Sequence, residues 1–223
     1  MSVPGRRESA ALLLSFDPPA WHLRHSRAVA ETAGWLALRA ASAGRSLDRR
    51  LVESGALLHD LDKLPAVKAS LDGLRHGDAT ASWLSAHGYE ELGPVIAGHP
   101  VTRLADASWF EDWLAGASPE ALIVAYSDKR AGQKLESMAE RFGSWKRRYP
   151  PEEQARRTRG SWSVETVAAV WERAERLERR VCEIAGCSPQ EVRRLRWTDA
   201  AIRAGTAAPA ATAAPASSAK AGR

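Results

Sequence analysis

The sequence has only two cysteines among its 223 residues, Cys182 and Cys187, and both lie near the C-terminal end. With no cysteine elsewhere, disulfides cannot hold the main part of the chain together, and two thiols alone make a poor zinc site. Long apolar runs are also missing, since no stretch approaches the roughly 18 apolar residues of a membrane-spanning helix. Residues 1–16 contain no apolar run of the length usual in a signal peptide. We therefore expect a reduced, cytoplasmic protein with no membrane partner.

Other patterns are absent as well. The chain shows no strong alternation of apolar and polar residues, no internal repeat and no glycine-rich phosphate loop, and no serine or cysteine is arranged for nucleophilic catalysis. What it does have is 44% apolar residues and nine tryptophans, enough for one sizeable core. Apolar residues recur at spacings of three and four, which is typical of amphipathic helices. The sequence therefore predicts an all-α fold, a helical bundle with a C-terminal helical extension.

Composition divides the chain into four parts. We expect an N-terminal segment over 1–16, a main helical domain over 17–150, an arginine-rich helical extension over 151–199 and a disordered Ala/Pro-rich tail over 200–223. The net charge of +5 is concentrated late, because residues 141–197 hold 14 Lys/Arg against 8 Asp/Glu. A solvated arginine-rich helix face explains this charge best. Nucleic-acid binding is a weaker alternative, since the aromatic-interleaved basic motifs of RNA-binding modules are missing.

The extension contains one long predicted helix, over 164–184. Its apolar residues form a seam at alternating spacings of three and four: Val167, Val170, Ala174, Leu177, Val181 and Ile184. Such a seam either packs across the main domain or pairs with a second copy of the chain as a homodimer.

The most informative stretch places His59 and Asp60 side by side at the end of an apolar helix that Pro65 closes. Burying an imidazole and a carboxylate beside leucines is costly unless both are compensated, and a divalent metal compensates both. A His-Asp pair that simply caps a core helix is the structural alternative. Lys63 follows one turn after His59, where it either pairs with the carboxylates or contacts a ligand phosphate.

Further histidines lie at the inward faces or ends of predicted helices. His25 falls on the inward face of a helix over 21–41, His76 precedes a helix over 79–86, and His99 follows a helix over 90–97. His87 ends the helix over 79–86, where the helix dipole favours it, and needs no chemical role.

Asp128 repeats the pattern of Asp60, because it too ends a nearly all-apolar helix, one that begins after Ser118. Lys129 and Arg130 follow it directly, and they either contact a substrate phosphate or lie on a solvated surface. Two apolar helices that each deliver a carboxylate suggest one shared target.

These residues form a mixed nitrogen and oxygen set that suits iron, manganese, cobalt, nickel or zinc and suits calcium poorly. Six of them can hold two ions if one carboxylate bridges, and Asp60 is the natural bridge. The candidate metal ligands are His25, His59, Asp60, His76, His99 and Asp128.

The order of these residues resembles the HD-domain metal-dependent phosphohydrolase superfamily, whose pattern is a first His, a His-Asp doublet and a later Asp. His25, His59-Asp60 and Asp128 match that pattern, and the resemblance covers about residues 21–148. The intervening His76 and His99 are similar to those of a two-metal subgroup. This subgroup includes the bacterial symmetrical diadenosine tetraphosphate hydrolases and the HD-GYP cyclic-dinucleotide phosphodiesterases. The chain lacks a Gly-Tyr-Pro motif, which argues against cyclic dinucleotides.

The resemblance implies a chemistry and a role for each residue. One ion would be held by His25, His59, Asp60 and Asp128, and the other by Asp60, His76 and His99. A water between the ions, acidified to hydroxide, would attack phosphorus in line. Asp60 and Lys63 would be catalytic.

The expected substrate is a nucleotide or another small phosphoester, with Lys63, Lys129 and Arg130 on its phosphate. Two alternatives remain: a nucleotide-binding regulatory module that turns nothing over, and a di-iron oxygenase on the same scaffold.

Overall fold

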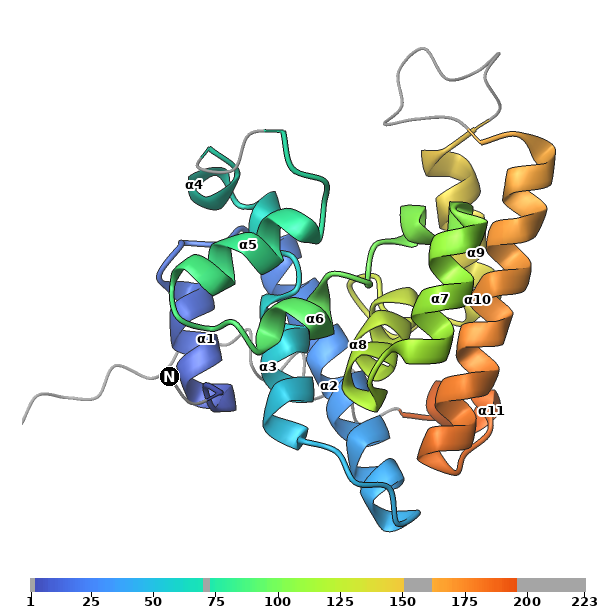
Figure 1. Ribbon diagram of the computed structural model, residues 1–223, viewed down its shortest axis with the longest axis horizontal. Helices are drawn as coiled ribbons and strands as arrows, with labels where there is room; N and C mark the ends of the chain where they lie inside the picture. Colours follow the sequence, from blue (N-terminus) through green and yellow to red (C-terminus); the bar gives the residue numbers. More distant parts are fainter. Residues whose placement is uncertain (1–2, 70–72, 151–161, 196–223) are drawn as a thin grey trace, which may run out of the picture.

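The computed structural model describes residues 3–69, 73–150 and 162–195 (Figure 1). Within these ranges the chain forms eleven α-helices and two short 3₁₀ helices, with no strand beyond one isolated bridge between Ala131 and Leu135. The α-helices are α1 Arg6–Leu14, α2 Ala20–Ser42, α3 Arg49–Leu58, α4 Pro65–Lys68, α5 Asp78–Ala86, α6 Leu92–Ile96, α7 Ala107–Gly116, α8 Pro119–Arg130, α9 Met138–Arg148, α10 Val164–Ala185 and α11 Pro189–Arg193; the 3₁₀ helices are η1 Leu61–Lys63 and η2 Val101–Ala105. The predicted all-α class is confirmed.

Local capping explains where several helices begin. The Asp48 carboxylate accepts a hydrogen bond from the Arg50 backbone N–H at 2.7 Å and starts α3. Ser118 caps α8 ahead of a proline at its first turn, and Ser163 caps α10. Asp78, directly before the predicted helix over 79–86, is the cap that the sequence suggests for α5, but the structure differs. Gly77 precedes this helix with φ of +86°, and the Asp78 carboxylate accepts instead from Arg103 at 2.5 Å.

The centre of the bundle is made by α2, α3 and α8, which pack against one another (Figure 1). Ala33 and Leu36 of α2, Leu58 of α3 and Ile123 of α8 are fully buried. Because these three helices meet in one core, the polar residues that each carries at the same level are brought together.

Residues at both ends of the described chain belong to this core. The N-terminal part forms α1, which the sequence did not predict; it packs on α3, and the Ser54 hydroxyl donates to the Pro4 carbonyl at 2.6 Å. At the other end, α10 packs on α2, α8 and η2 and buries Val170, Leu177 and Val181 completely. The apolar seam therefore packs across the main domain, which is one of the two arrangements that the sequence allows, and a homodimer stays a prediction. The tail over 200–223 lies outside the described residues.

Leu177→Ala is expected to lower the free energy of unfolding by about 2 to 5 kcal/mol, because it opens a cavity where α10 meets the main domain. Urea unfolding measures this loss. Leu38→Ala is the control, since Leu38 is 47% exposed. Equal effects of the two substitutions would show that the α10 seam is not part of the core.

No helix in the described ranges combines the length and hydropathy that crossing a bilayer requires.

Candidate metal centre

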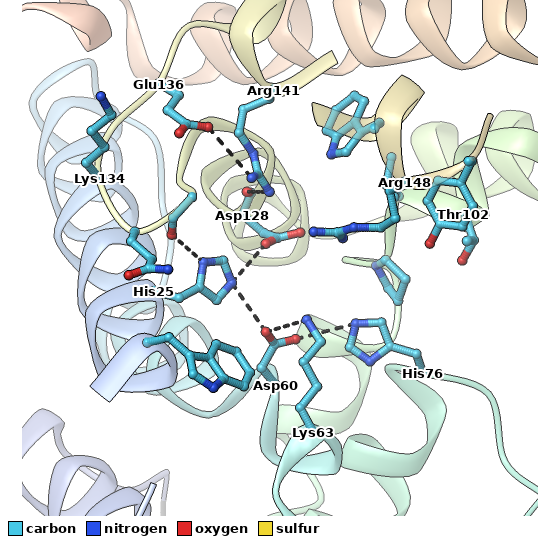
Figure 2. Close-up of a pocket in the computed structure, with 17 residues that line it drawn as sticks. His25, Asp60, Lys63, His76, Thr102, Asp128, Lys134, Glu136, Arg141 and Arg148 are labelled. Carbon is cyan, nitrogen blue, oxygen red and sulfur yellow. Dashed lines mark hydrogen bonds and ion pairs between the residues drawn. The ribbon is translucent and has the colours of Figure 1, made fainter. Parts of the chain in front are cut away.

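The structure brings all six predicted metal ligands together: His25, Asp60, His76 and Asp128 line one cavity, and His59 and His99 are buried against them. His25 comes from α2 and Asp128 from α8, while the loops that follow α3 and α6 and precede α5 supply the others (Figure 2). Neighbouring residues of a straight helix point about 100° apart, which would separate His59 from Asp60. The chain avoids this because α3 ends at Leu58 and Asp60 leaves the helical conformation, with φ of −109° and ψ of 20°.

The first cluster joins His25, His59 and Asp128. The Nε2 atoms of the two histidines lie 3.1 Å apart, and Asp128 Oδ1 is 3.3 Å from His25 Nε2 and 3.7 Å from His59 Nε2. Asp60 Oδ2 completes the group at 3.3 Å from His25 Nε2 and 3.5 Å from His59 Nε2. Two imidazole nitrogens and two carboxylate oxygens thus surround one point.

The second cluster joins His76 and His99 to the other oxygen of the same carboxylate. Their Nε2 atoms lie 3.1 Å apart, and Asp60 Oδ1 is 3.4 Å from His76 Nε2 and 3.3 Å from His99 Nε2. Asp60 therefore presents one oxygen to each cluster, which is the arrangement expected of a bridging carboxylate.

Backbone carbonyls fix the orientation of three histidine rings. The Nδ1 atoms lie 2.7 to 2.8 Å from carbonyl oxygens, His25 from Gly132, His59 from Ala56 and His99 from Ile96. A carbonyl only accepts, so this network places a ring proton on Nδ1, and in the neutral ring Nε2 then carries the lone pair that a metal ion needs. Metal-binding histidines are commonly held in this way.

The Oδ1 atom of Asp60 is buried and accepts no hydrogen bond. Its nearest neighbours in the second cluster are the lone pairs of His76 and His99, so electron-rich atoms face one another without a donor between them. Such an arrangement costs free energy unless a cation sits among the atoms. The residues present therefore fit a metal ion.

Electrostatics in the first cluster point the same way. Burial alone would raise the pKa of Asp60, but His59 and Lys63 hold it well below its usual range. The pKa of Asp128 is likewise low, because the nearby His25 and His59 outweigh its burial. Burial lowers the pKa of His25, yet Asp128 and Asp60 raise it to about 9, so its Nε2 has a high affinity for a cation, whether a proton or a metal ion. The cavity thus holds two ionised carboxylates and attracts positive charge.

Asp62 is a positioning residue that sequence analysis missed. Its carboxylate lies 2.8 Å from His76 Nδ1 and accepts from the Gly77 N–H at 3.0 Å. The pair fixes the His76 ring, as the carbonyls fix the other rings. The available signal was a second aspartate two residues after Asp60.

Asp62→Asn is expected to weaken metal binding at the second cluster by about 10- to 100-fold, because outer carboxylates orient metal-binding histidines. Competition titration with a chelating dye measures this affinity. Asp112→Asn on the exposed face of α7 is the control. Unchanged affinity in Asp62→Asn would show that His76 is held by other contacts.

His22 lies behind the doublet. It is fully buried, and its Nε2 donates to the Asp60 backbone carbonyl at 3.1 Å. This contact supports the turn between α3 and η1, so His22 is a structural neighbour of the cavity. His87 lies elsewhere, with its ring stacked on Trp83 at 3.7 Å between centroids.

Lys129 and Arg130 correct an expectation, because neither lines the pocket. Both are buried. Lys129 Nζ donates to the His99 carbonyl at 2.7 Å, and burial lowers its pKa to about 8. Arg130 pairs with Glu178 of α10 at 3.1 Å. These cations hold the backbone around the site, and a substrate phosphate cannot reach them without rearrangement.

The cations that do face the pocket come from other positions. The two clusters open into a cavity of about 490 Å³, and the cations on its wall are Lys63, Lys134, Arg141 and Arg148 (Figure 2). Arg141 and Arg148 belong to α9. The basic composition of residues 141–197 was the sequence signal for them, although it did not indicate which arginines face the site.

Comparison with known families agrees with this geometry. Residues 23–132 match the HD domain, so this part of the chain, which carries all six candidate ligands, is an HD domain. Helices continue beyond residue 132. No curated protein and no solved structure matches the chain significantly. The expected two-metal subgroup therefore stays a prediction.

Proposed function

We propose that this protein is a metal-dependent phosphohydrolase that acts on a nucleotide or another small phosphoester. The observation that carries the proposal is Asp60, whose two oxygens face two separate histidine pairs at the base of a cation-lined pocket. One ion would be held by His25, His59, Asp60 and Asp128, and a second by Asp60, His76 and His99.

A divalent transition metal in this cavity, such as iron, manganese, cobalt, nickel or zinc, would lower the pKa of a water and offset negative charge on a phosphoryl group. The chain's own residues prepare the site for this chemistry. Asp60 stays ionised, because its pKa lies well below the usual range. Lys63 Nζ donates to Asp60 Oδ2 at 2.6 Å, and the side chain is 27% exposed. Lys63 can therefore orient the carboxylate and meet a phosphoryl oxygen from the pocket side.

The pocket wall supports an anionic substrate with an aromatic part. Figure 2 shows the Arg148 guanidinium extending toward Asp128, on the side of the pocket opposite Lys134. Trp21, 42% exposed, contributes an indole ring to the same wall. Guanidinium and ammonium groups bind phosphate oxygens, and an exposed indole offers a flat surface for a base. These features favour a nucleotide.

The residues on this pocket wall also help to distinguish a phosphohydrolase from the two alternative functions. A di-iron oxygenase acting on a neutral substrate does not need four cations on the wall of its pocket, so this lining favours a phosphorylated ligand. A regulatory module that only binds nucleotides would have the same pocket and differs by lacking turnover.

Metal analysis and an activity panel test the proposal. The protein is purified anaerobically without chelator and its metal content is measured. Hydrolysis of mononucleotides and simple phosphomonoesters is followed by phosphate release, and that of dinucleoside polyphosphates by chromatography of the nucleotide products, with added Mn²⁺, Fe²⁺ or Co²⁺. Metal-dependent hydrolysis is expected. A protein that binds no transition metal would overturn the proposal, and one that binds metal and nucleotide without turnover would support the regulatory module.

Arg148→Ala is expected to raise KM by about 10- to 100-fold with a smaller change in kcat, because the variant loses one charge-assisted hydrogen bond to a substrate phosphate. Steady-state kinetics measure this split. Arg147→Ala is the matched control, because Arg147 is exposed on α9 outside the pocket and donates to Ser144 at 3.0 Å. Equal KM values in the two variants would remove Arg148 from the substrate site.

A further inference from the structure

The C-terminal end of α10 has the geometry of a Schellman motif. Gly186 adopts the left-handed conformation, with φ of 58° and ψ of 44°, and its N–H donates to the Glu183 carbonyl at 3.4 Å. The Cys187 N–H donates back to the Cys182 carbonyl at 3.0 Å. In this motif the first and last residues of the longer hydrogen-bonded turn lie side by side, and their side chains usually make an apolar contact. Here both positions are cysteines.

The two cysteine side chains differ in exposure. Cys182 is 6% exposed and Cys187 is half-buried. Both line a shallow hollow at the junction of α10 and α11, together with Arg179 and Pro189. Neither lines the pocket of the metal centre. A small oxidant can therefore reach the pair from the surface, at Cys187 first.

We propose that Cys182 and Cys187 form a reversible intrachain disulfide when the protein meets hydrogen peroxide. The backbone turn supplies the geometry, because the hydrogen bond from the Cys187 N–H to the Cys182 carbonyl holds the two residues side by side. Disulfides need such close approach of the two backbones, and most cysteine pairs lack it.

Exposure and charge assign the order of the two steps. The Cys182 thiol donates to the Cys187 sulfur, which raises the pKa of Cys182 and lowers the pKa of Cys187. The Cys187 thiolate attacks one peroxide oxygen, the O–O bond breaks, and the other oxygen leaves as hydroxide that takes a proton to become water. The Cys182 sulfur then attacks the sulfenic acid, and its thiol proton leaves with the hydroxyl as a second water. Each of the two sulfurs loses one electron, and the peroxide accepts these two electrons.

Thiol counting on the full chain tests the proposal. Before hydrogen peroxide two thiols react with an alkylating reagent; after it none should, the intact mass should fall by about 2 Da, and dithiothreitol should restore both. Cys182→Ser should stop at a sulfenic acid about 16 Da heavier, which dimedone traps. Cys187→Ser should show neither product at the same peroxide dose. Thiols that stay alkylatable, or disulfide-linked dimers in place of the intrachain product, would overturn the proposal.

A second variant tests the turn itself. Gly186→Ala keeps both cysteines but places a Cβ at a positive φ, 3.3 Å from Ala43 Cβ. It should slow disulfide formation several-fold. Gly143→Ala in α9 is the control, because its Cβ would meet nothing closer than 3.6 Å. Circular dichroism confirms that each variant is folded. Equal oxidation rates would show that the turn does not position the thiols.

Discussion

Asp60→Asn is expected to abolish bound metal and to lower phosphate release by at least about 10³-fold, while the protein stays helical. The carboxylate faces both clusters, so its loss removes an anionic oxygen from each of them. An amide of the same shape keeps the packing, but it offers one neutral oxygen where two charged oxygens stood. Several kcal/mol of charge stabilisation would be lost with the metal. Metal content by mass spectrometry, circular dichroism and kinetics measure the three effects.

His87→Ala is the matched control for this experiment. His87 is a histidine of the same domain, but it is exposed and stacks on Trp83 at the end of α5. Its removal should leave metal content and activity nearly unchanged. A severe loss of activity in His87→Ala, or full metal content in Asp60→Asn, would show that the ligand set is misassigned.

His99→Ala is expected to reduce the bound metal from two ions to one and to lower activity by about 10²-fold or more, since a second ion held here would offset charge on the phosphoryl group. His99 contacts Asp60 Oδ1, and its Nε2 also lies 3.1 Å from His76. The first cluster does not need its imidazole as a ligand. Metal stoichiometry and kinetics at saturating metal measure the change.

His25→Ala gives the complementary measurement. In the first cluster His25 Nε2 lies 3.3 Å from Asp128 Oδ1 and 3.3 Å from Asp60 Oδ2. Loss of His25 should therefore weaken binding of the ion that His99→Ala leaves in place. Two-site behaviour predicts one residual ion in each single variant and none in the double variant. A wild-type protein that binds only one ion at saturation would reduce the site to a single-metal centre.

The bounds of a helix could be predicted well where they depend on residues within one or two turns of its ends. The predicted helix over 21–41 is α2, and the predicted helix over 164–184 is α10, because periodic apolar faces and local caps act within one or two turns. The sequence did not predict α1, whose short apolar run becomes helical by packing on α3. It also misjudged Asp78, because a distant arginine competes with the backbone for that carboxylate.

The candidate metal ligands could also be predicted from sequence. Polar residues at the ends of apolar helices must meet inside one core, and burial without compensation would be too costly. Residue type, order and helix position therefore sufficed to select six residues that the structure brings together, and all six lie within residues 23–132, which match the HD domain.

The cations that line the pocket could not be predicted from sequence in the same way. Lys129 and Arg130 are neighbours of Asp128 in sequence, but the turn of α8 buries them against the His99 loop and α10. Arg148 lies 20 residues later and reaches the pocket because α9 folds back over it. Long flexible cations are placed by the packing of whole helices, so sequence distance says little about which phosphate they can reach.

The sequence by itself determined the all-helical class, the main helix boundaries and the six candidate ligands, because local hydrogen bonding and the cost of burying charge act at the level of single residues. Only the tertiary structure decided which oxygen of Asp60 faces which histidines, that Asp62 holds His76, and that the seam of α10 packs within the chain. These features depend on the relative placement of helices far apart in sequence, which is fixed by the packing of the shared core.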